Sequence, residues 1–258
     1  MFTFKNIIYT EEDDNITWIQ FNRPNKLNAF TKEMWEELYQ SLELAKSNKT
    51  KLVVITGIGK AFSAGDDIPS MYELKTKEES LSFFRILEKP FKSLLDFKKP
   101  VIGMVNGLAY GGGCELLLFM DIVVSCKDSK FALPEAKLGL IPPVALSVGY
   151  SVLGIKQINR LALTGEAIDV YEAQRIGLVD YIVESDKLKD KTLEIAWKII
   201  SNSNGPIQYI KSSSNKHKFK VELADIIEKL AVFSIDTESK QRMEAFINKK
   251  DETSSIFC

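Results

Sequence analysis

Strand-like and helix-like hydrophobic patterns alternate over the first two thirds of the chain. Short apolar runs, typical of strands, occur at 4–9, 16–21, 52–56, 100–107, 122–126, 131–133 and 178–183. Stretches with helical periodicity or helix-start signals occur at 31–45, 78–97, 111–120, 154–165 and 169–177. From about Leu188 onward the pattern is helical and more charged. This order predicts an α/β core followed by a helical tail.

Local signals refine these elements. Residues 16–21 alternate apolar and polar side chains, which predicts a half-exposed strand. Thr31 and Asp67 are expected to cap helices at their amino termini. Pro90 should kink or divide the helix that contains it, because proline has no N–H to donate. The polar stretch SSSNKHKFK at 212–220 is expected to be an exposed loop.

Composition excludes several classes of protein. The chain has 258 residues, 45% of them apolar, which suits one large domain or a domain with an appendage. A net charge of −1 offers no general attraction for nucleic acid or for an anionic membrane. Three cysteines without a CxxC pair favour neither a disulfide framework nor a thiolate metal site. With no signal-peptide pattern and no membrane-spanning apolar run, the expected location is the cytoplasm.

Missing motifs narrow the chemistry further. The single histidine, His217, lies in a polar stretch and is expected at the surface, so a serine or cysteine nucleophile would have no histidine partner. The chain has no GxSxG, Walker or GxGxxG motif and no His/Cys cluster for zinc. For an enzyme, a metal-free mechanism based on carboxylates or backbone groups remains.

Two glycine turns are candidates for such a mechanism. Ala64-Gly65-Asp66 and Gly111-Gly112-Gly113 each lie between a predicted strand and a predicted helix. N–H groups at a helix amino terminus have no intrahelical partner and attract negative charge. If the two turns face each other they form an oxyanion hole. Otherwise they are ordinary strand-to-helix turns.

Two glutamates are candidate acid/base groups. Glu115 lies just after the glycine triplet in an apolar helix start, where burial raises its pKa and the helix terminus lowers it. Glu135 follows Leu133-Pro134 at a predicted strand end. Either one is equally compatible with a simple first-turn carboxylate, and sequence separation alone does not bring the two together.

Several motifs in order resemble the enoyl-CoA hydratase/isomerase, or crotonase, superfamily. They are NRPNKLNAF, AFSAGDDI, KPVIGMVNGLAYGGGCELLLFMDIVV, FALPEAKLGLIP and LTGEAIDVYEAQRIGLVDYIV, and the resemblance extends to the terminal RMEAFINKK. It implies an α/β spiral of ββα units over residues 1–195. It also implies a helical region over 196–258 that assembles the protein as a trimer or a dimer of trimers.

The resemblance also assigns site residues. It implies that the N–H groups of Asp66 and Gly112 form the oxyanion hole, and that Glu115 and Glu135 are the catalytic pair, with Glu115 acting on water and Glu135 on Cα. Coenzyme A belongs to the substrate, and the resemblance implies neither a separate cofactor nor a metal. The substrate-binding positions that it implies are Asn25, Lys26, Leu27, Ala61, Ala64, Asp67, Ile68, Gly111, Pro134, Pro142 and Lys249, the last reaching a neighbouring subunit's ligand.

The activity implied is reversible syn hydration of a 2-enoyl-CoA to a 3-hydroxyacyl-CoA, because both glutamates are present. A double-bond isomerase of the same superfamily, which needs one carboxylate, is the first alternative. A non-catalytic or RNA-binding relative is the second, although the chain lacks an arginine-rich or aromatic-basic motif.

Two positions depart from the pattern of hydratases. Asp66 replaces a small residue, and its carboxylate is expected either to cap the following helix or to contact a substrate hydroxyl or water. IPPVALSVGY at 141–150 replaces a glycine-rich stretch, so Pro143, Val144 and Ala145 reduce backbone freedom beside the acyl end of the site.

Overall fold

The large sheet organises the chain. The computed structural model describes residues 4–12, 15–218 and 223–252. Strands of the large sheet follow the order β1-β2-β3-β5-β7-β10; the β1–β2 pair is antiparallel and the other neighbours are parallel. Their bounds are β1 Ile7–Glu12, β2 Ile16–Phe21, β3 Leu52–Gly57, β5 Val101–Val105, β7 Ile122–Cys126 and β10 Tyr181–Val183.

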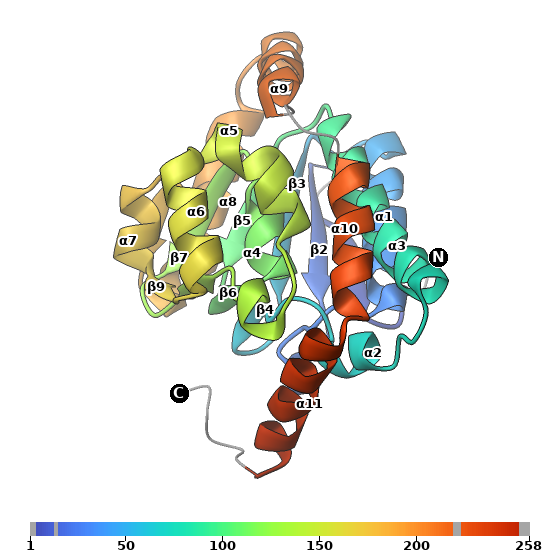
Figure 1. The fold of residues 1–258 in the computed structure, drawn as a ribbon. Helices are drawn as coiled ribbons and strands as arrows, with labels where there is room; N and C mark the ends of the chain where they lie inside the picture. The colour runs from blue at the N-terminus through green and yellow to red at the C-terminus, as the bar shows by residue number, and fades with distance from the viewer. Residues whose placement is uncertain (1–3, 13–14, 219–222, 253–258) are drawn as a thin grey trace.

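A second, smaller sheet explains the repeated pattern of the sequence. Its order is β4 (Ala61–Ser63), β6 (Leu108–Tyr110), β8 (Lys130–Ala132) and β9 (Ile168–Asp169). In three successive repeats the first strand, β3, β5 or β7, joins the large sheet, and the next, β4, β6 or β8, joins the small one. Helical segments follow each pair (Figure 1). The predicted spiral of ββα units is confirmed.

Helices enclose both sheets. In chain order they are α1 Lys32–Ser47, α2 Ile68–Tyr72, α3 Lys77–Leu95, α4 Gly112–Leu117, α5 Tyr150–Val152, α6 Ile155–Thr164, α7 Val170–Arg175, α8 Leu188–Ile200, α9 Asn204–Lys218, α10 Leu223–Ser234 and α11 Thr237–Glu252. Short 3₁₀ turns are η1 Pro24–Lys26, η2 Glu135–Leu138 and η4 Ser185–Lys187, and η3, Ala145–Gly149, is a π-helical turn. Within the described ranges, no helix is long and apolar enough to cross a bilayer.

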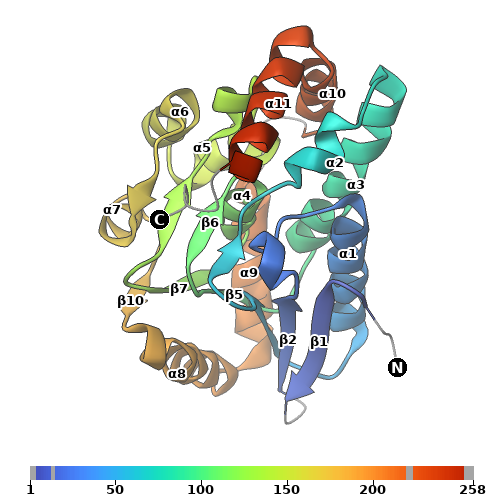
Figure 2. The same cartoon turned by 90° about the horizontal axis from the view of Figure 1, so that it is seen from below.

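Two hydrophobic clusters flank the large sheet. The larger lies among α1, α3, α4, α10 and both sheets, and the smaller lies under α8 on the opposite face (Figures 1 and 2). β2 contributes Ile19 and Phe21 to the first cluster and Ile16 and Trp18 to the second. The prediction of a half-exposed strand at 16–21 was therefore wrong, because α8, distant in sequence, covers its second face.

The structure contradicts two further local predictions, a helix divided at Pro90 and an exposed loop at 212–218. α3 runs unbroken through Pro90, whose ring is buried in the core, so packing holds the helix together despite the missing N–H donor. The stretch at 212–218 belongs to α9 instead of an exposed loop, while 219–220 lies outside the described residues. His217 is exposed, as expected.

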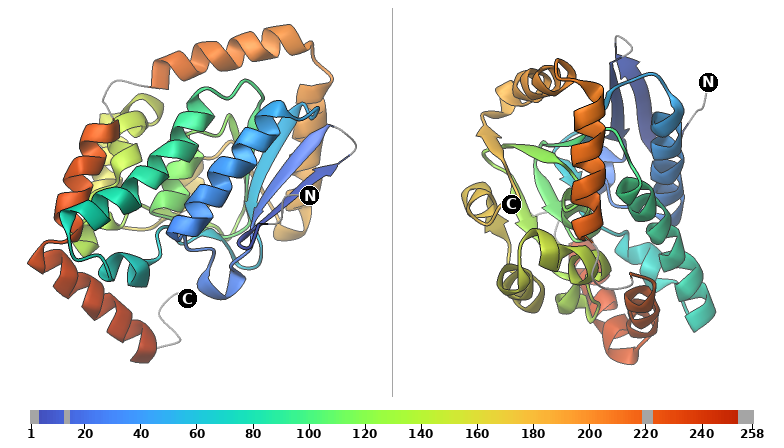
Figure 3. Two further views of the ribbon diagram at one scale, coloured as in Figure 1. Left: turned by 90° about the vertical axis from the view of Figure 1, so that its right-hand side faces the viewer. Right: turned by 90° about the horizontal axis from the view of Figure 1, so that it is seen from above.

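Buried polar contacts explain why the polar α9 forms. The helix crosses one end of the molecule (Figure 3), where its Lys211 is 3% exposed and donates to both carboxylate oxygens of Asp121, at 2.8 and 2.6 Å. One turn later, Asn215 donates to the carbonyl of Leu95 at 2.7 Å. The side chains that hold α9 against the core are therefore polar ones, for which the sequence alone predicts exposure to solvent. The proposed boundary at 195/196 falls within α8, and the division into two parts stays a prediction.

Substitution of Lys211 by methionine should destabilise the protein. The change leaves the Asp121 carboxylate in its partly buried position with only the N–H of Val101 as donor, which should lower the free energy of unfolding by about 3 kcal/mol. Urea denaturation measures the difference. The matched control is Lys198→Met, which removes an exposed ion pair with Glu194 and should cost about 0.5 kcal/mol. Equal losses in the two variants would contradict the account of α9.

Candidate active site

The two glycine turns touch each other. Gly65 has a φ of +85°, and a Cβ atom there would lie 2.8 Å from the carbonyl oxygen of Tyr110 and 3.2 Å from the nitrogen of Gly112. A side chain at this position would force the turns apart. The turn after β4 and the turn after β6 therefore form one site, which confirms that they face each other.

Backbone pairing orients the Asp66 N–H. Phe30 donates its N–H to the carbonyl of Gly65 and accepts the N–H of Asp67, both at 2.8 Å. This parallel bridge leaves the N–H of Asp66 on the side away from Phe30. Gly112, the first residue of α4, has an N–H that no intrahelical carbonyl can accept. The local geometry thus leaves two adjacent donors for a developing negative charge.

The Asp66 carboxyl group is held by Trp35. Its Oδ1 accepts the indole N–H of Trp35 at 2.8 Å. Asp67, not Asp66, occupies the N-cap position of α2, and its side chain accepts from the Ser70 hydroxyl instead of a backbone N–H. The expectation that Asp66 caps this helix was therefore wrong. Burial raises the pKa of Asp66 to about 6, although the Trp35 hydrogen bond opposes the rise.

Glu115 is buried in α4 and fixed by two backbone donors. It is 1% exposed, and its Oε1 accepts the N–H groups of Val144 and Ala145, both at 2.8 Å. Burial is the main cause that raises the pKa of Glu115 well above its usual range, and the charge of Glu135 raises it further. The two N–H groups act in the opposite direction because they stabilise the carboxylate. The unusual 141–150 stretch thus supplies the anchor of the first glutamate.

Glu135 begins η2 and leans over the second glycine turn. Its Oε1 lies 3.1 Å from the position that a Cβ atom would occupy on Gly111. Oε2 is buried without a hydrogen-bond partner among the described residues. Burial raises the pKa of Glu135 to about 8, because the charged form loses its solvation there. In the structure both glutamates lie beside both turns, a proximity that their spacing in the sequence did not predict.

Comparison with known proteins identifies the fold. The sequence profile of the enoyl-CoA hydratase/isomerase family matches residues 11–253. A short-chain-enoyl-CoA hydratase of Clostridium acetobutylicum is 34% identical over 252 residues, which cover 95% of this chain and 96% of that protein. The mitochondrial enoyl-CoA hydratase of Pongo abelii is 34% identical over 255 residues, covering 96% and 87%. The chain belongs to the enoyl-CoA hydratase/isomerase, or crotonase, superfamily.

Solved structures of this superfamily agree with the fold. An enoyl-CoA hydratase/isomerase from Mycobacterium paratuberculosis superposes with a TM-score of 0.86 at 22% identity, over 93% of this chain and 98% of that one. An enoyl-CoA hydratase subunit from Geobacillus kaustophilus gives 0.76 at 28% identity, over 95% and 96%. The crotonase fold and its carboxy-terminal helices are therefore established.

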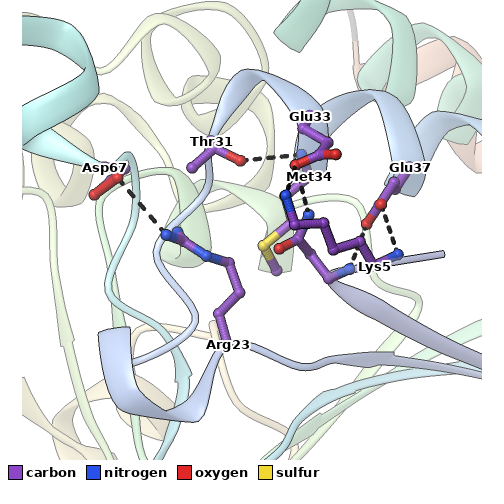
Figure 4. Close-up of polar contacts among 8 residues, drawn as sticks. Lys5, Arg23, Thr31, Glu33, Met34, Glu37 and Asp67 are labelled. Carbon is purple, nitrogen blue, oxygen red and sulfur yellow. Dashed lines mark hydrogen bonds and ion pairs between the residues drawn. The ribbon is translucent and has the colours of Figure 1, made fainter.

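The predicted coenzyme A loop lies beside the first turn. Asn25 and Lys26 are exposed on η1, and the carbonyl of Leu27 accepts the N–H of Ala64 at 2.9 Å. Figure 4 shows Arg23, at the base of this loop, reaching Asp67 across 3.8 Å, near the Thr31 cap of α1. Several predicted binding positions thus lie around one edge of the first glycine turn.

Asn28 was not among the predicted site residues. It has a left-handed backbone with φ of 56°, and its amide group donates to the carbonyls of Ile58 and Ala61 at 3.0 and 2.8 Å. Its side-chain oxygen accepts the N–H of Arg23 at 2.9 Å. The buried amide fastens the loop to β4. The sequence around it, Lys26-Leu27-Asn28-Ala29, gives no signal of this role beyond the general tolerance of asparagine for left-handed backbone.

The remaining predicted binding residues divide by location. Gly111 and Pro134 are the N-cap residues of α4 and η2, Ile68 is the first residue of α2, and Pro142 is buried before η3. Lys249 lies exposed on α11, and its reach to a neighbouring subunit stays a prediction. Over the described part of the chain, no group of three or more histidine, cysteine, aspartate or glutamate side chains is placed to hold a metal ion.

Replacement of Glu135 by glutamine should stabilise the protein increasingly as pH rises. Because the folded-state pKa is raised to about 8, the native protein binds more protons than the unfolded chain between the two pKa values. The stability linked to this group is complete at low pH and is lost as pH rises through 8. Glutamine cannot ionise, so the variant's advantage in free energy of unfolding should grow by about 1–3 kcal/mol between pH 5 and pH 8.5.

Urea denaturation at both pH values measures this change. Glu166→Gln, at an exposed glutamate, is the control and should show the same difference from the unsubstituted protein at both pH values. A pH-independent advantage of Glu135→Gln would mean that Glu135 ionises normally in the folded protein.

Proposed function

We propose that this protein is an enoyl-CoA hydratase that adds water reversibly to a 2-enoyl-CoA to give a 3-hydroxyacyl-CoA. The observation that carries the proposal is the pair of glutamates, Glu115 and Glu135, beside the adjacent N–H groups of Asp66 and Gly112. Hydration needs one group to remove a proton from water and another to deliver a proton to carbon. Relatives at 34% identity that are named as hydratases support the same activity.

The thioester carbonyl would accept both N–H groups. Water oxygen bonds to C3 while the C2–C3 double bond opens, and negative charge moves to the thioester oxygen as an enolate. The two donors stabilise that charge, and losing one such donor typically costs about 10²–10³ in rate. A proton then bonds to C2 on the same face, so one water molecule is added in total and no redox step occurs.

The contacts of the two carboxyl groups suggest different roles. Burial raises the pKa of Glu115, and its two backbone N–H donors oppose that rise by stabilising the carboxylate, so Glu115 would be a base strong enough to take the proton from water. Glu135, with a pKa near 8, would carry the proton that goes to C2. Because the charge of Glu135 raises the pKa of Glu115, the two buried carboxyl groups would not both ionise readily, and the pair would share one proton, which the reaction regenerates.

Glutamine at either position should abolish most of the activity. We expect Glu115→Gln and Glu135→Gln each to lower kcat by about 10²–10⁴-fold on crotonyl-CoA, because each removes one proton-transfer group. Calorimetric binding of butyryl-CoA, which cannot be hydrated, should change little. Glu194→Gln on α8, which is exposed, is the matched control and should keep full activity. Near-normal turnover in either site variant would remove that residue from the mechanism.

Product mass separates hydration from isomerisation. With crotonyl-CoA, a hydratase product gains one water molecule. With a 3-enoyl-CoA, an isomerase shifts the double bond at constant mass. Isomerisation without hydration by the unsubstituted protein would replace the proposed activity by that of the other branch of the superfamily.

Self-association is part of the proposal. Large apolar side chains are exposed on the helices after the core: Trp197, Tyr209, Ile210, Val232 and Phe233. Such a set of exposed apolar residues favours an interface. Light scattering at micromolar concentration should give three or six times the mass of one chain, and a monomer would contradict the assembly.

A further inference from the structure

Trp35 is the one indole side chain that reaches the proposed site in the described structure. It is fully buried and stacks on Phe30, with ring centroids 3.9 Å apart and planes 18° apart. Phe30 in turn forms the backbone bridge on both sides of Asp66. The Trp35 ring also packs under the second turn, where its Cζ2 lies 3.1 Å from the position of a Cβ atom on Gly112. One rigid side chain therefore touches both turns.

The Asp66 carboxylate is a potential competitor for the oxyanion hole. Helix amino-terminal N–H groups bind carboxylates well, and this carboxylate is attached to the turn that supplies one of the two donors. Its Oδ2 already lies 3.7 Å from the position of a Cβ atom on Gly112. A carboxylate free to rotate here would occupy the donors that a thioester oxygen needs. The hydrogen bond from the Trp35 indole to Oδ1, at 2.8 Å, restrains that rotation.

We propose that Trp35 is a positioning residue that holds the Asp66 carboxylate off the oxyanion-hole N–H groups and so keeps them open to the substrate. This inference rests on the hydratase function proposed above. It explains how a turn with an aspartate can work where hydratases carry a small residue. Trp35 and Asp66 then act as one unit, because the indole N–H is needed only while the Asp66 carboxylate is present.

A double-mutant cycle tests the unit. Trp35→Phe keeps an aromatic ring but removes the N–H donor, so kcat on crotonyl-CoA should fall by about 10–10²-fold while KM changes less than about threefold. In an Asp66→Ala background the competitor is absent, so the same Trp35→Phe change should lower kcat by less than about threefold. An equal loss in both backgrounds would show that Trp35 serves packing only and would overturn the proposal.

A matched variant controls for loss of an indole N–H. Trp18 donates its indole N–H to the Glu12 carboxylate at 2.7 Å on the β1–β2 pair. Trp18→Phe should leave kcat within about twofold of the unsubstituted protein, because it alters no group of the proposed site. Urea midpoints measured for every variant show that the compared proteins are folded.

The carbonyl stretch of bound butyryl-CoA gives a readout that needs no turnover. With a ¹³C-labelled thioester carbonyl, hydrogen bonds from the oxyanion hole should lower the stretching frequency. This downward shift of the carbonyl frequency should be smaller in Trp35→Phe and should be restored in Trp35→Phe/Asp66→Ala. An unchanged frequency in Trp35→Phe would overturn the proposal. If the unsubstituted protein does not hydrate crotonyl-CoA but the carbonyl frequencies of the variants follow the expected pattern, only the proposed hydratase activity is overturned.

Discussion

The contact between Gly65 and the Gly111–Gly112 turn is the constraint on which the site depends. It exists because the small sheet pairs β4 directly with β6, so the loops that follow these strands meet at the same end. Any side chain at position 65 would strike the backbone of the other turn. The same closeness brings the Asp66 N–H, just before α2, near the Gly112 N–H at the start of α4, and the carboxyl groups of Asp66 and Glu135 lie above the glycines.

This arrangement concentrates three carboxyl groups in a mostly buried space. Burial raises the pKa of Asp66, Glu115 and Glu135, and the charges of these groups influence one another. Such a cluster is unfavourable for folding at alkaline pH, and the protein offsets it with specific donors: the indole of Trp35 and the N–H groups of Val144 and Ala145. Under the proposed function, Glu115 and Glu135 would use these raised pKa values for proton transfer at neutral pH.

Sequence reasoning predicted the order of strands and helices, because periodicity and helix-start signals are local. Those signals made Glu115 and Glu135 candidates only; the family resemblance paired them, and their catalytic role stays a prediction. Sequence reasoning missed the features that depend on contacts between segments distant in sequence. α8 buries the second face of β2. Core packing around Pro90 keeps α3 continuous although proline lacks an N–H donor. The buried contact between Lys211 and Asp121 stabilises α9 in a polar stretch of sequence. At the site it did not find Trp35 or Asn28, because a tryptophan at helical spacing looks like any core residue. Nor could it place the N–H groups of Val144 and Ala145, since that requires knowing where η3 packs.

The central claim is that one oxyanion hole with two carboxyl groups adds water across a double bond. The most direct test is to incubate the unsubstituted protein with crotonyl-CoA in H₂¹⁸O and, separately, in D₂O. The account predicts one ¹⁸O atom at C3 in the first case, and one carbon-bound deuterium at C2, on the face that receives the oxygen, in the second. Recovery of thioester with no solvent oxygen at C3 would contradict it.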